Sequence, residues 1–349
     1  MRTLLHHRPL SGLLKQTFTN RSLLLTSSRL YSTPSTEPQI YSHSLPLPST
    51  RGCITILTLN RAATRNAISR QLLSELRANI DSIAAEYDSE GNEVPPKKVF
   101  GGAAGEGMGP TRALILTSGV DESFCSGADL KERKDMTNDE SKAMLTTPFF
   151  HCRAAVFLTK LRNTFTAIST LPIPTISAVS SLALGGGLEL ALSTHLRVFA
   201  STAQVALPET RLGIIPGAGG TYRLPAIIGL SRARDLILTG RRITAAEAYF
   251  LGIADRLVEV SSENSEGESK EVEKELLKKG REEALREAVI LAGQICEGGP
   301  IAVRAALNAL SWAREEVENQ MYDRVIGTED RNEALAAFRE KRKPVFTGR

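Results

Sequence analysis

Short β-branched stretches alternate with helical stretches along most of this chain, and that alternation restricts its possible folds more than any other feature. Four stretches have the composition of β-strands, at residues 54–59, 113–117, 175–179 and 196–200. Helical patterns lie between them, and the clearest places five apolar side chains on one face: Ile68, Leu72, Leu76, Ile80 and Ile83. Strands that alternate with helices predict an α/β fold.

The chain changes character after about residue 270, where the pattern becomes helical throughout. We expect three helices there, at residues 271–296, 300–314 and about 315–339. A capping box at Thr244 and Glu247 predicts a shorter helix ahead of them, and Gly252 can end it.

Two segments interrupt this pattern and read as insertions. Residues 88–112 hold six glycines and three prolines in 25 residues, which is typical of a mobile loop. A Ser- and Glu-rich segment near 261–275 should be solvated. The sequence thus predicts four regions, namely an N-terminal arm over 1–31, a Pro-, Ser- and Thr-rich linker over 32–50, a core over 51–296 and a C-terminal helical region over 297–349.

The formal net charge of +4 comes from one end of the chain. Residues 1–33 carry five basic side chains and no Asp or Glu, which leaves 38 basic and 39 acidic residues elsewhere. A basic, acid-free, Ser-rich start is typical of a mitochondrial transit peptide, and Arg29 suggests a mature start near Ser32. A disordered basic tail is the alternative. The nearly neutral remainder weakens the case for a nucleic-acid partner.

Composition also excludes several classes of protein. With 349 residues, 42% of them hydrophobic, the chain can bury a core without disulfides or metal ions. Its four cysteines lie far apart with no Cys-x-x-Cys pair, so we expect no metal site and no disulfide. The longest uncharged stretch, residues 171–188, is broken by prolines, serines and glycines and is a poor candidate for a membrane span.

The motif at residues 184–192 is the most informative, because three glycines open an apolar helix after a strand. Glycine lets the backbone approach a ligand closely, and free N–H groups at a helix start point toward an anion there. Glu189 lies in the first turn amid leucines, and this setting would raise its pKa and make it a usable proton donor. The alternative is that Glu189 only favours the helix dipole.

A second motif, at residues 123–131, follows the strand over 113–117 and precedes a charged helical stretch. A turn at Gly127 and Ala128 can present a second backbone N–H, and an oxyanion hole needs two such groups from separate segments. An ordinary turn with Asp129 as a helix cap is the alternative.

A third motif, at residues 207–220, contains Glu209 after Pro208 and then a tight run of small residues with available N–H donors. A single Glu in a loop is usually only solvated. Two glutamates that flank one site could instead divide the acid and base roles.

Together, in this order and spacing, the three motifs resemble those of the crotonase (enoyl-CoA hydratase/isomerase) superfamily. The resemblance runs from about residue 53 to residue 346 and is interrupted by the two insertions. It implies an α/β fold, a crotonase-like spiral of ββα units with a C-terminal helical trimerisation region, assembled as trimers or as dimers of trimers. Within the superfamily, the motifs are most similar to those of mitochondrial 3-methylglutaconyl-CoA hydratases, which act in leucine breakdown in the matrix.

The resemblance also implies roles for particular residues. The backbone N–H groups of Ala128 and Gly186 would bind the thioester oxygen, and the N–H of Gly217 would orient water. Glu209 would transfer a proton at the α-carbon, while Glu189 would help to activate that water. No metal is implied, and no cofactor, because CoA is part of the acyl-CoA substrate.

Further residues match positions that contact CoA in this superfamily. They lie in the second motif and in the C-terminal tail, which reaches the CoA of a neighbouring subunit. These residues are Ala128, Asp129, Leu130, Lys131, Phe338 and Lys341.

Two alternatives remain open at this point. One is a general short- or medium-chain enoyl-CoA hydratase or isomerase of fatty-acid β-oxidation, although the presence of both Glu189 and Glu209 favours hydration. A glutaconyl group carries a distal carboxylate that needs a cation. The helical stretch that follows the second motif offers three candidates for it, namely Arg153, Lys160 and Arg162.

The other alternative is an AU-rich RNA-binding protein. The matching helix, residues 66–77, carries Arg70 and Arg77 but also Glu75 and no lysine. RNA affinity needs several phosphate-neutralising cations on one face, so we do not expect RNA binding.

Overall fold

The structure is a computed structural model that describes residues 37–48, 51–95, 109–129, 132, 153–261 and 270–349. The predicted transit peptide over 1–31 therefore lies outside the described residues, as do Leu130, Lys131 and Cys152. The described residues from Pro38 to Arg349 belong to one compact unit. Among them, no helix is both long enough and apolar enough to cross a bilayer.

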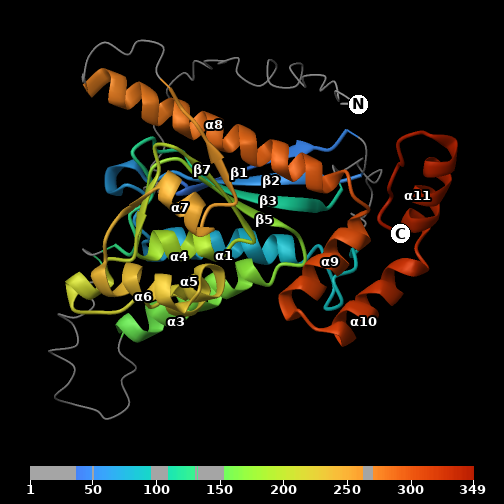
Figure 1. The fold of residues 1–349 in the computed structure, drawn as a ribbon, viewed down its shortest axis with the longest axis horizontal. Coiled ribbons are helices and arrows are strands. Elements are labelled where there is room, and N and C mark those ends of the chain that lie inside the picture. The colour runs from blue at the N-terminus through green and yellow to red at the C-terminus, as the bar shows by residue number, and fades with distance from the viewer. Residues whose placement is uncertain (1–36, 49–50, 96–108, 130–131, 133–152, 262–269) are drawn as a thin grey trace, which may run out of the picture. The chain divides into compact units, whose positions relative to one another are not determined.

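A six-stranded sheet forms the centre of this unit (Figure 1). Its strands, in spatial order, are β1 (Ile40–Pro46), β2 (Cys53–Leu59), β3 (Thr111–Ser118), β5 (Thr175–Val179), β7 (Leu196–Ala200) and β10 (Arg256–Val258). All neighbouring strands are parallel except β1 and β2. The four predicted strands correspond to β2, β3, β5 and β7, so this part of the prediction is confirmed.

A second sheet is built from four very short strands. These are β4 (Ser123–Cys125), β6 (Leu182–Leu184), β8 (Gln204–Ala206) and β9 (Ile243–Thr244). Each of the first three follows directly on a strand of the central sheet and leads toward helical structure. The chain therefore repeats a ββα unit, as the predicted crotonase-like spiral requires.

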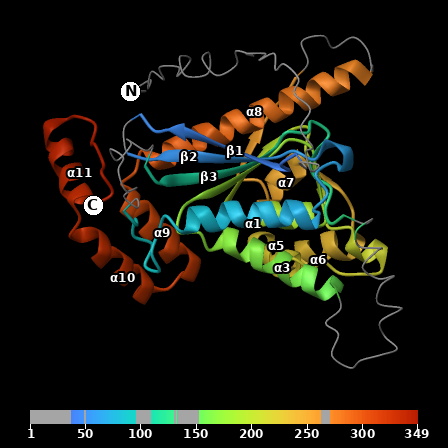
Figure 2. The ribbon, with the colours of Figure 1, turned by 180° about the vertical axis from the view of Figure 1, so that it is seen from behind.

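Helices cover both faces of the central sheet (Figures 1 and 2). Helix α8 (Lys270–Cys296) packs on one face, where Ile54, Ile115 and Val198 meet its buried alanines. The opposite face, with Leu114 and Leu116, packs on a layer of other helices. These are α1 (Arg70–Ala84), α3 (Arg153–Ser169), α4 (Gly186–Leu192), α5 (Gly220–Ile228), α6 (Leu230–Thr239) and α7 (Ala245–Leu251). Two 3-10 helices complete this part of the chain: η1 (Ala62–Thr64) follows β2, and η2 (Glu209–Leu212) follows β8.

Two helix signals of the sequence are confirmed. The predicted apolar face of α1 is buried from Leu72 to Ile83, although Ile68 lies before its N-cap, Ser69. The side chain of Thr244 accepts the Glu247 N–H as the N-cap of α7, and α7 ends at Gly252.

The linker predicted over 32–50 is wrong in its second half, because β1 lies there. All seven residues of β1 pair antiparallel with β2, and only Ile40 is buried. A polar edge strand needs no apolar face, so its sequence resembles a linker.

The ends of both predicted insertions have defined structure, and the rest of each lies outside the described residues. Residues 88–95 form a packed turn in which Tyr87 bridges Glu93, and β3 already begins at Thr111. Helix α8 begins at Lys270, within the segment predicted near 261–275.

The C-terminal region contains α9 (Pro300–Trp312), α10 (Glu315–Ile326) and α11 (Glu329–Glu340). The single helix predicted over 315–339 is therefore two helices. Gly327 ends α10, and the Thr328 side chain then accepts the Arg331 N–H as the N-cap of α11. A glycine followed by a capping threonine ends one helix and begins the next, and the spacing of apolar residues alone does not reveal this boundary.

Candidate active site

The loop after β4 presents the first of the two predicted backbone donors. Gly127 has a left-handed φ of 95°, and a Cβ built on it would lie 2.8 Å from the Leu184 carbonyl oxygen. Ile68 donates its N–H to the Gly127 carbonyl at 2.8 Å and accepts the Asp129 N–H at 3.2 Å. Because successive peptide groups of an extended segment face opposite sides, the Ala128 N–H points away from Ile68.

The first turn of α4 presents the second donor. Gly185 caps the helix with a φ of 53°, and Gly186 is the first helical residue, whose N–H has no acceptor within the helix. A Cβ built on Gly187 would lie 2.0 Å from the Cys125 carbonyl oxygen, so α4 packs directly on the end of β4. A Cβ built on Gly186 would lie 3.6 Å from the Ala128 nitrogen. The two predicted donors are therefore neighbours, as an oxyanion hole requires.

Glu189 lies buried one turn along the same helix, with an exposed fraction of 2%. Its Oε1 atom accepts the N–H groups of Ala218 and Gly220, both at 2.8 Å. Burial raises the pKa of this carboxyl, as the apolar sequence around it predicts. The two hydrogen bonds and the charges of Arg223 and Arg162 oppose that increase. A buried carboxyl with a raised pKa in such a turn is a candidate for proton exchange.

Glu209 begins η2 and is also buried, with an exposed fraction of 8%. A Cβ built on Gly185 would lie 2.9 Å from Glu209 Oε1, so this carboxyl group lies against the start of α4. The Glu189 N–H donates to the Gly185 carbonyl at 3.0 Å. Both predicted glutamates therefore flank the same turn of the chain.

Gly217 lies in the turn that holds Glu189, immediately before Ala218. A Cβ built on Gly217 would lie 3.0 Å from Leu158 Cδ1 of α3, and the Gly217 carbonyl accepts Arg162 Nε at 2.6 Å. The structure therefore places Gly217 next to the residue that donates to Glu189.

The first group of predicted CoA contacts lies next to the donor loop. The Asp129 carboxylate is buried and pairs with Arg61 at 2.7 Å, so it serves the chain's own structure. Leu130 and Lys131 follow it but lie outside the described residues.

The second group lies elsewhere. Phe338 is 85% exposed near the end of α11, and Lys341 caps that helix in the left-handed conformation. Helix α11 lies beyond α9 and α10, away from α4 (Figures 1 and 2). Within one chain these two residues are not brought to the glutamates.

Arg61 supports the site but was missed in the sequence. Its guanidinium donates to the Ala67 carbonyl at 2.9 Å and pairs with Asp129, the neighbour of Ala128. Asp129 lies 68 residues further along the chain. No local pattern could have revealed this link between the two segments.

The three cations considered for a distal carboxylate differ in their location and contacts. Lys160 and Arg162 lie on α3 and are exposed, and the Arg153 side chain lies outside the described residues. Arg162 already donates to the Gly217 carbonyl, which ties it to the turn that holds Glu189.

The helix considered for RNA contributes to a groove of about 820 Å³ between α1 and α3. Arg70, Arg77 and Lys160 line it, together with Asp81. Arg77 pairs with Asp81 at 2.8 Å and also donates to the Asn163 carbonyl. The acid neutralises part of the positive charge that a phosphate backbone would need.

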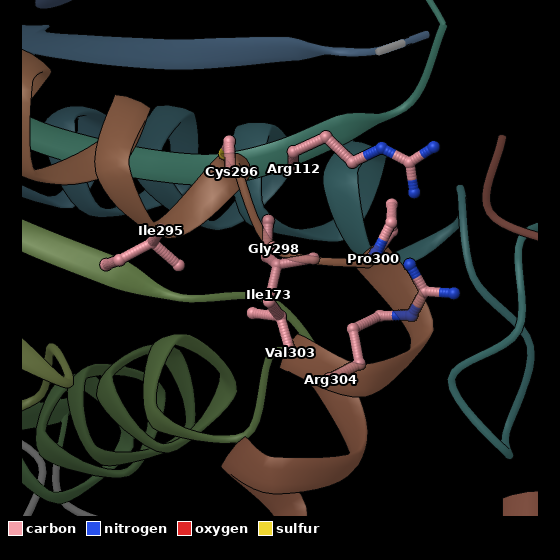
Figure 3. A pocket seen from close by; sticks show the side chains of 8 residues that line it. All are labelled: Arg112, Ile173, Ile295, Cys296, Gly298, Pro300, Val303 and Arg304. Carbon is pink, nitrogen blue, oxygen red and sulfur yellow. The ribbon is translucent and has the colours of Figure 1, made fainter. Parts of the chain in front are cut away.

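A cavity at the end of the central sheet, shown in Figure 3, is not part of this site. Its volume of about 10 Å³ matches one water molecule and excludes a CoA thioester. Arg112 of β3 and Arg304 of α9 line it, and both guanidinium groups bind the Glu93 carboxylate. This cluster joins the C-terminal helices to the sheet.

The cysteines and the possible metal ligands were also located in the part of the chain that is described. Cys53, Cys125 and Cys296 are buried free thiols there. The described His, Cys, Asp and Glu side chains form no group of three that could hold a metal ion.

Residues 109–349 match the family model described as enoyl-CoA hydratase/isomerase, and this chain belongs to that family. The superfamily, the fold and the enzyme class predicted from the sequence are confirmed.

Two relatives and one crystal structure show how similar the chain is to known members. Methylglutaconyl-CoA hydratase 1, mitochondrial, of Pyricularia oryzae is 57% identical over 337 residues, which cover 94% of this chain and 93% of that protein. An enoyl-CoA isomerase/hydratase of Zymoseptoria tritici is 51% identical and covers 93% of this chain and 94% of its own. The crystal structure of an enoyl-CoA hydratase from Bacillus anthracis has a TM-score of 0.67 and 34% identity, and it covers 89% of this chain and 100% of its own.

Proposed function

We propose that this protein adds water to the double bond of a 2-enoyl-CoA thioester, with 3-methylglutaconyl-CoA as its substrate. The observation that carries the proposal is the placement of two backbone N–H groups, from Ala128 and Gly186, beside the turn that Glu189 and Glu209 flank. The choice of substrate rests on the 57% identity to the Pyricularia hydratase.

In the proposed reaction, the two N–H groups bind the thioester carbonyl oxygen. When the water oxygen bonds to the β-carbon, the π electrons move toward that carbonyl and form an enolate. The Ala128 and Gly186 N–H groups stabilise this oxyanion, and each such donor contributes about 3–4 kcal/mol to the transition state. Gly187 contributes by leaving space for the close packing that keeps the two donors together.

The glutamates divide the proton transfers in this proposal. Glu189 is ionised, with Oε1 held by Ala218 and Gly220, and its other oxygen takes a proton from the attacking water. Glu209, protonated at the start, delivers its proton to the α-carbon of the enolate, which restores the thioester. One water has then been added, Glu189 carries the proton taken from it, and Glu209 is ionised. A proton passes from Glu189 to Glu209 before the next turnover, which restores both carboxyl groups. The CoA moiety belongs to the substrate, so no further cofactor takes part.

A homo-oligomer, a trimer or a pair of trimers, completes the proposed site. Several large apolar side chains of the C-terminal helices are exposed, including Leu310 at 77%, Trp312 at 61% and Tyr322 at 64%. Contact with other subunits would cover them. Phe338 and Lys341 would then reach the CoA of a neighbour. We place the protein in the mitochondrial matrix, in keeping with its basic N-terminal arm and its mitochondrial relative.

Steady-state hydration of 3-methylglutaconyl-CoA and crotonyl-CoA tests the proposal. We expect a higher kcat/KM for the branched dicarboxylic substrate. Glu189→Gln and Glu209→Gln should each remove most of the turnover while thioester binding persists, and Glu259→Gln, an exposed acid that follows β10, should leave both unchanged. Absence of hydration of either thioester by the wild-type protein would refute the proposal.

Isomerisation is a second candidate, favoured by the name of the Zymoseptoria relative. The same pair of glutamates could move a proton between the α- and γ-carbons of a 3-enoyl-CoA. Conversion of a 3-enoyl-CoA to its 2-enoyl isomer, faster than hydration of the product, would favour this function over hydration.

A further inference from the structure

Two arginines donate hydrogen bonds to the turn that holds Glu189, on the side of the turn that faces away from this glutamate. Arg162 of α3 donates Nε to the Gly217 carbonyl at 2.6 Å, and Arg223 of α5 donates to the Ala218 carbonyl at 2.9 Å. On the inner side, the Ala218 N–H donates to Glu189. The turn is therefore held between a buried carboxylate and two guanidinium groups.

One planar peptide unit connects Arg162 to Glu189. The carbonyl of Gly217 and the N–H of Ala218 belong to the same peptide group, which is trans. In a trans peptide these two bonds point in opposite directions and rotate only together. A donor that fixes the Gly217 carbonyl therefore also fixes the direction of the Ala218 N–H toward Glu189 Oε1.

We propose that Arg162 is a positioning residue for the proton transfers at Glu189. It acts through the Gly217–Ala218 peptide group. This group determines which Glu189 oxygen accepts the Ala218 N–H and which one faces the reacting water. This role differs from that of a cation for a distal carboxylate. The inference rests on the proposed function, since it assigns Glu189 a proton-transfer step.

Charge gives Arg162 a second effect. Among the described charged groups, Arg223 of α5 and Arg162 of α3 act on the Glu189 carboxyl, and the Glu209 carboxyl of η2 lies against Gly185 at the start of the helix that carries Glu189. Both arginines favour the ionised Glu189, against its burial. Loss of the Arg162 charge therefore raises the pKa of Glu189 further.

The test compares Arg162→Met, Arg162→Lys and Arg232→Met in the full chain. Arg232 is an exposed cation on α6 with no part in the proposed site, so its replacement is the control and should leave kcat and KM unchanged. We expect Arg162→Met to lower kcat roughly tenfold with less than about a twofold change in KM, since a misdirected group slows the chemical step. The acidic limb of the kcat–pH profile of Arg162→Met should move to higher pH, because Glu189 must be ionised for turnover and its pKa is higher in this variant. Arg162→Lys keeps the charge without the planar Nε donor, so kcat should fall while the limb stays in place.

The outcomes separate the two proposals. A wild-type protein that hydrates neither thioester overturns the proposed function. An active wild type with an Arg162→Met variant within twofold of it at every pH overturns the positioning role alone. Arg162→Met could also lose kcat while the acidic limb of its pH profile stays in place, with a lower melting temperature in both Arg162 variants. This result would show that Arg162 has a merely structural role, and it would overturn the positioning role.

Discussion

Gly187→Ala tests whether the candidate active site depends on the contact between α4 and β4. A Cβ at this position would lie 2.0 Å from the Cys125 carbonyl oxygen and 3.0 Å from the Cys125 Cβ. The φ of Gly187 is not left-handed, so the helix itself would accept alanine. The two elements must therefore separate, and the Gly186 N–H must move away from the Ala128 N–H.

Two opposed effects decide the result. Alanine in a helix interior is usually more stable than glycine by about 0.5–1 kcal/mol. Forcing one more carbon into a packed core costs about 1–3 kcal/mol, and here the obstacle is backbone that cannot rotate away. A net loss of about 1–2 kcal/mol in the free energy of unfolding should result. A displacement near 1 Å of one oxyanion donor should lower kcat about 100-fold.

Gly293→Ala in α8 is the matched control, because a Cβ there meets nothing within 4 Å. Urea titration should show Gly293→Ala to be stabilised by up to about 1 kcal/mol and Gly187→Ala to be destabilised. Hydration kinetics should then show normal turnover for the first variant and a large loss for the second. A Gly187→Ala protein that is as stable and as active as the wild type would refute the reasoning.

Two further predictions concern stability. Burial lowers the pKa of His195 from 6.5 to about 4, so between these pH values the unfolded chain binds more protons than the folded one. The free energy of unfolding should therefore rise with pH over that window by up to about 3 kcal/mol in urea titrations, and His195→Asn should flatten this dependence. Glu93→Gln should lower the free energy of unfolding by about 3–5 kcal/mol, because it removes the charge that the buried Arg112 and Arg304 share. Asp81→Asn, in an exposed ion pair, should lower it by less than about 1 kcal/mol. A loss at Glu93 no larger than that at Asp81 would contradict the buried-cluster argument.

The long strands that are buried could be predicted because burial dictates their composition, whereas β1, equally long but mostly exposed, could not. All eight residues of β3 are buried, and such a strand has an apolar, β-branched sequence on both faces. The strands of the second sheet have only two or three residues, which is too few for any period. Their pairing arises from the path of the chain, so the spiral of ββα units followed from the resemblance and not from the strand pattern.

The groups around the predicted reaction could be found because each lies in a local motif. Gly186 and Glu189 lie in one helix turn, and Ala128 follows a glycine in a strand-to-helix turn. Arg61 and Arg162 could not be assigned, because each acts on a segment more than 50 residues away: 68 residues to Asp129 and 55 to Gly217. A side chain that binds a distant carbonyl leaves no pattern in the sequence near it.

One glycine in each of the three motifs has the same physical cause, which explains why such local motifs identify a site made of distant segments. A Cβ on Gly127 would meet the Leu184 carbonyl at 2.8 Å, one on Gly185 would meet Glu209 Oε1 at 2.9 Å, and one on Gly220 would meet Glu189 Oε1 at 3.1 Å. Each glycine therefore marks a contact with another motif rather than a flexible point. Since each space is matched by a group from a partner segment, the three motifs together encode the packing that brings two donors and two carboxyl groups into one place.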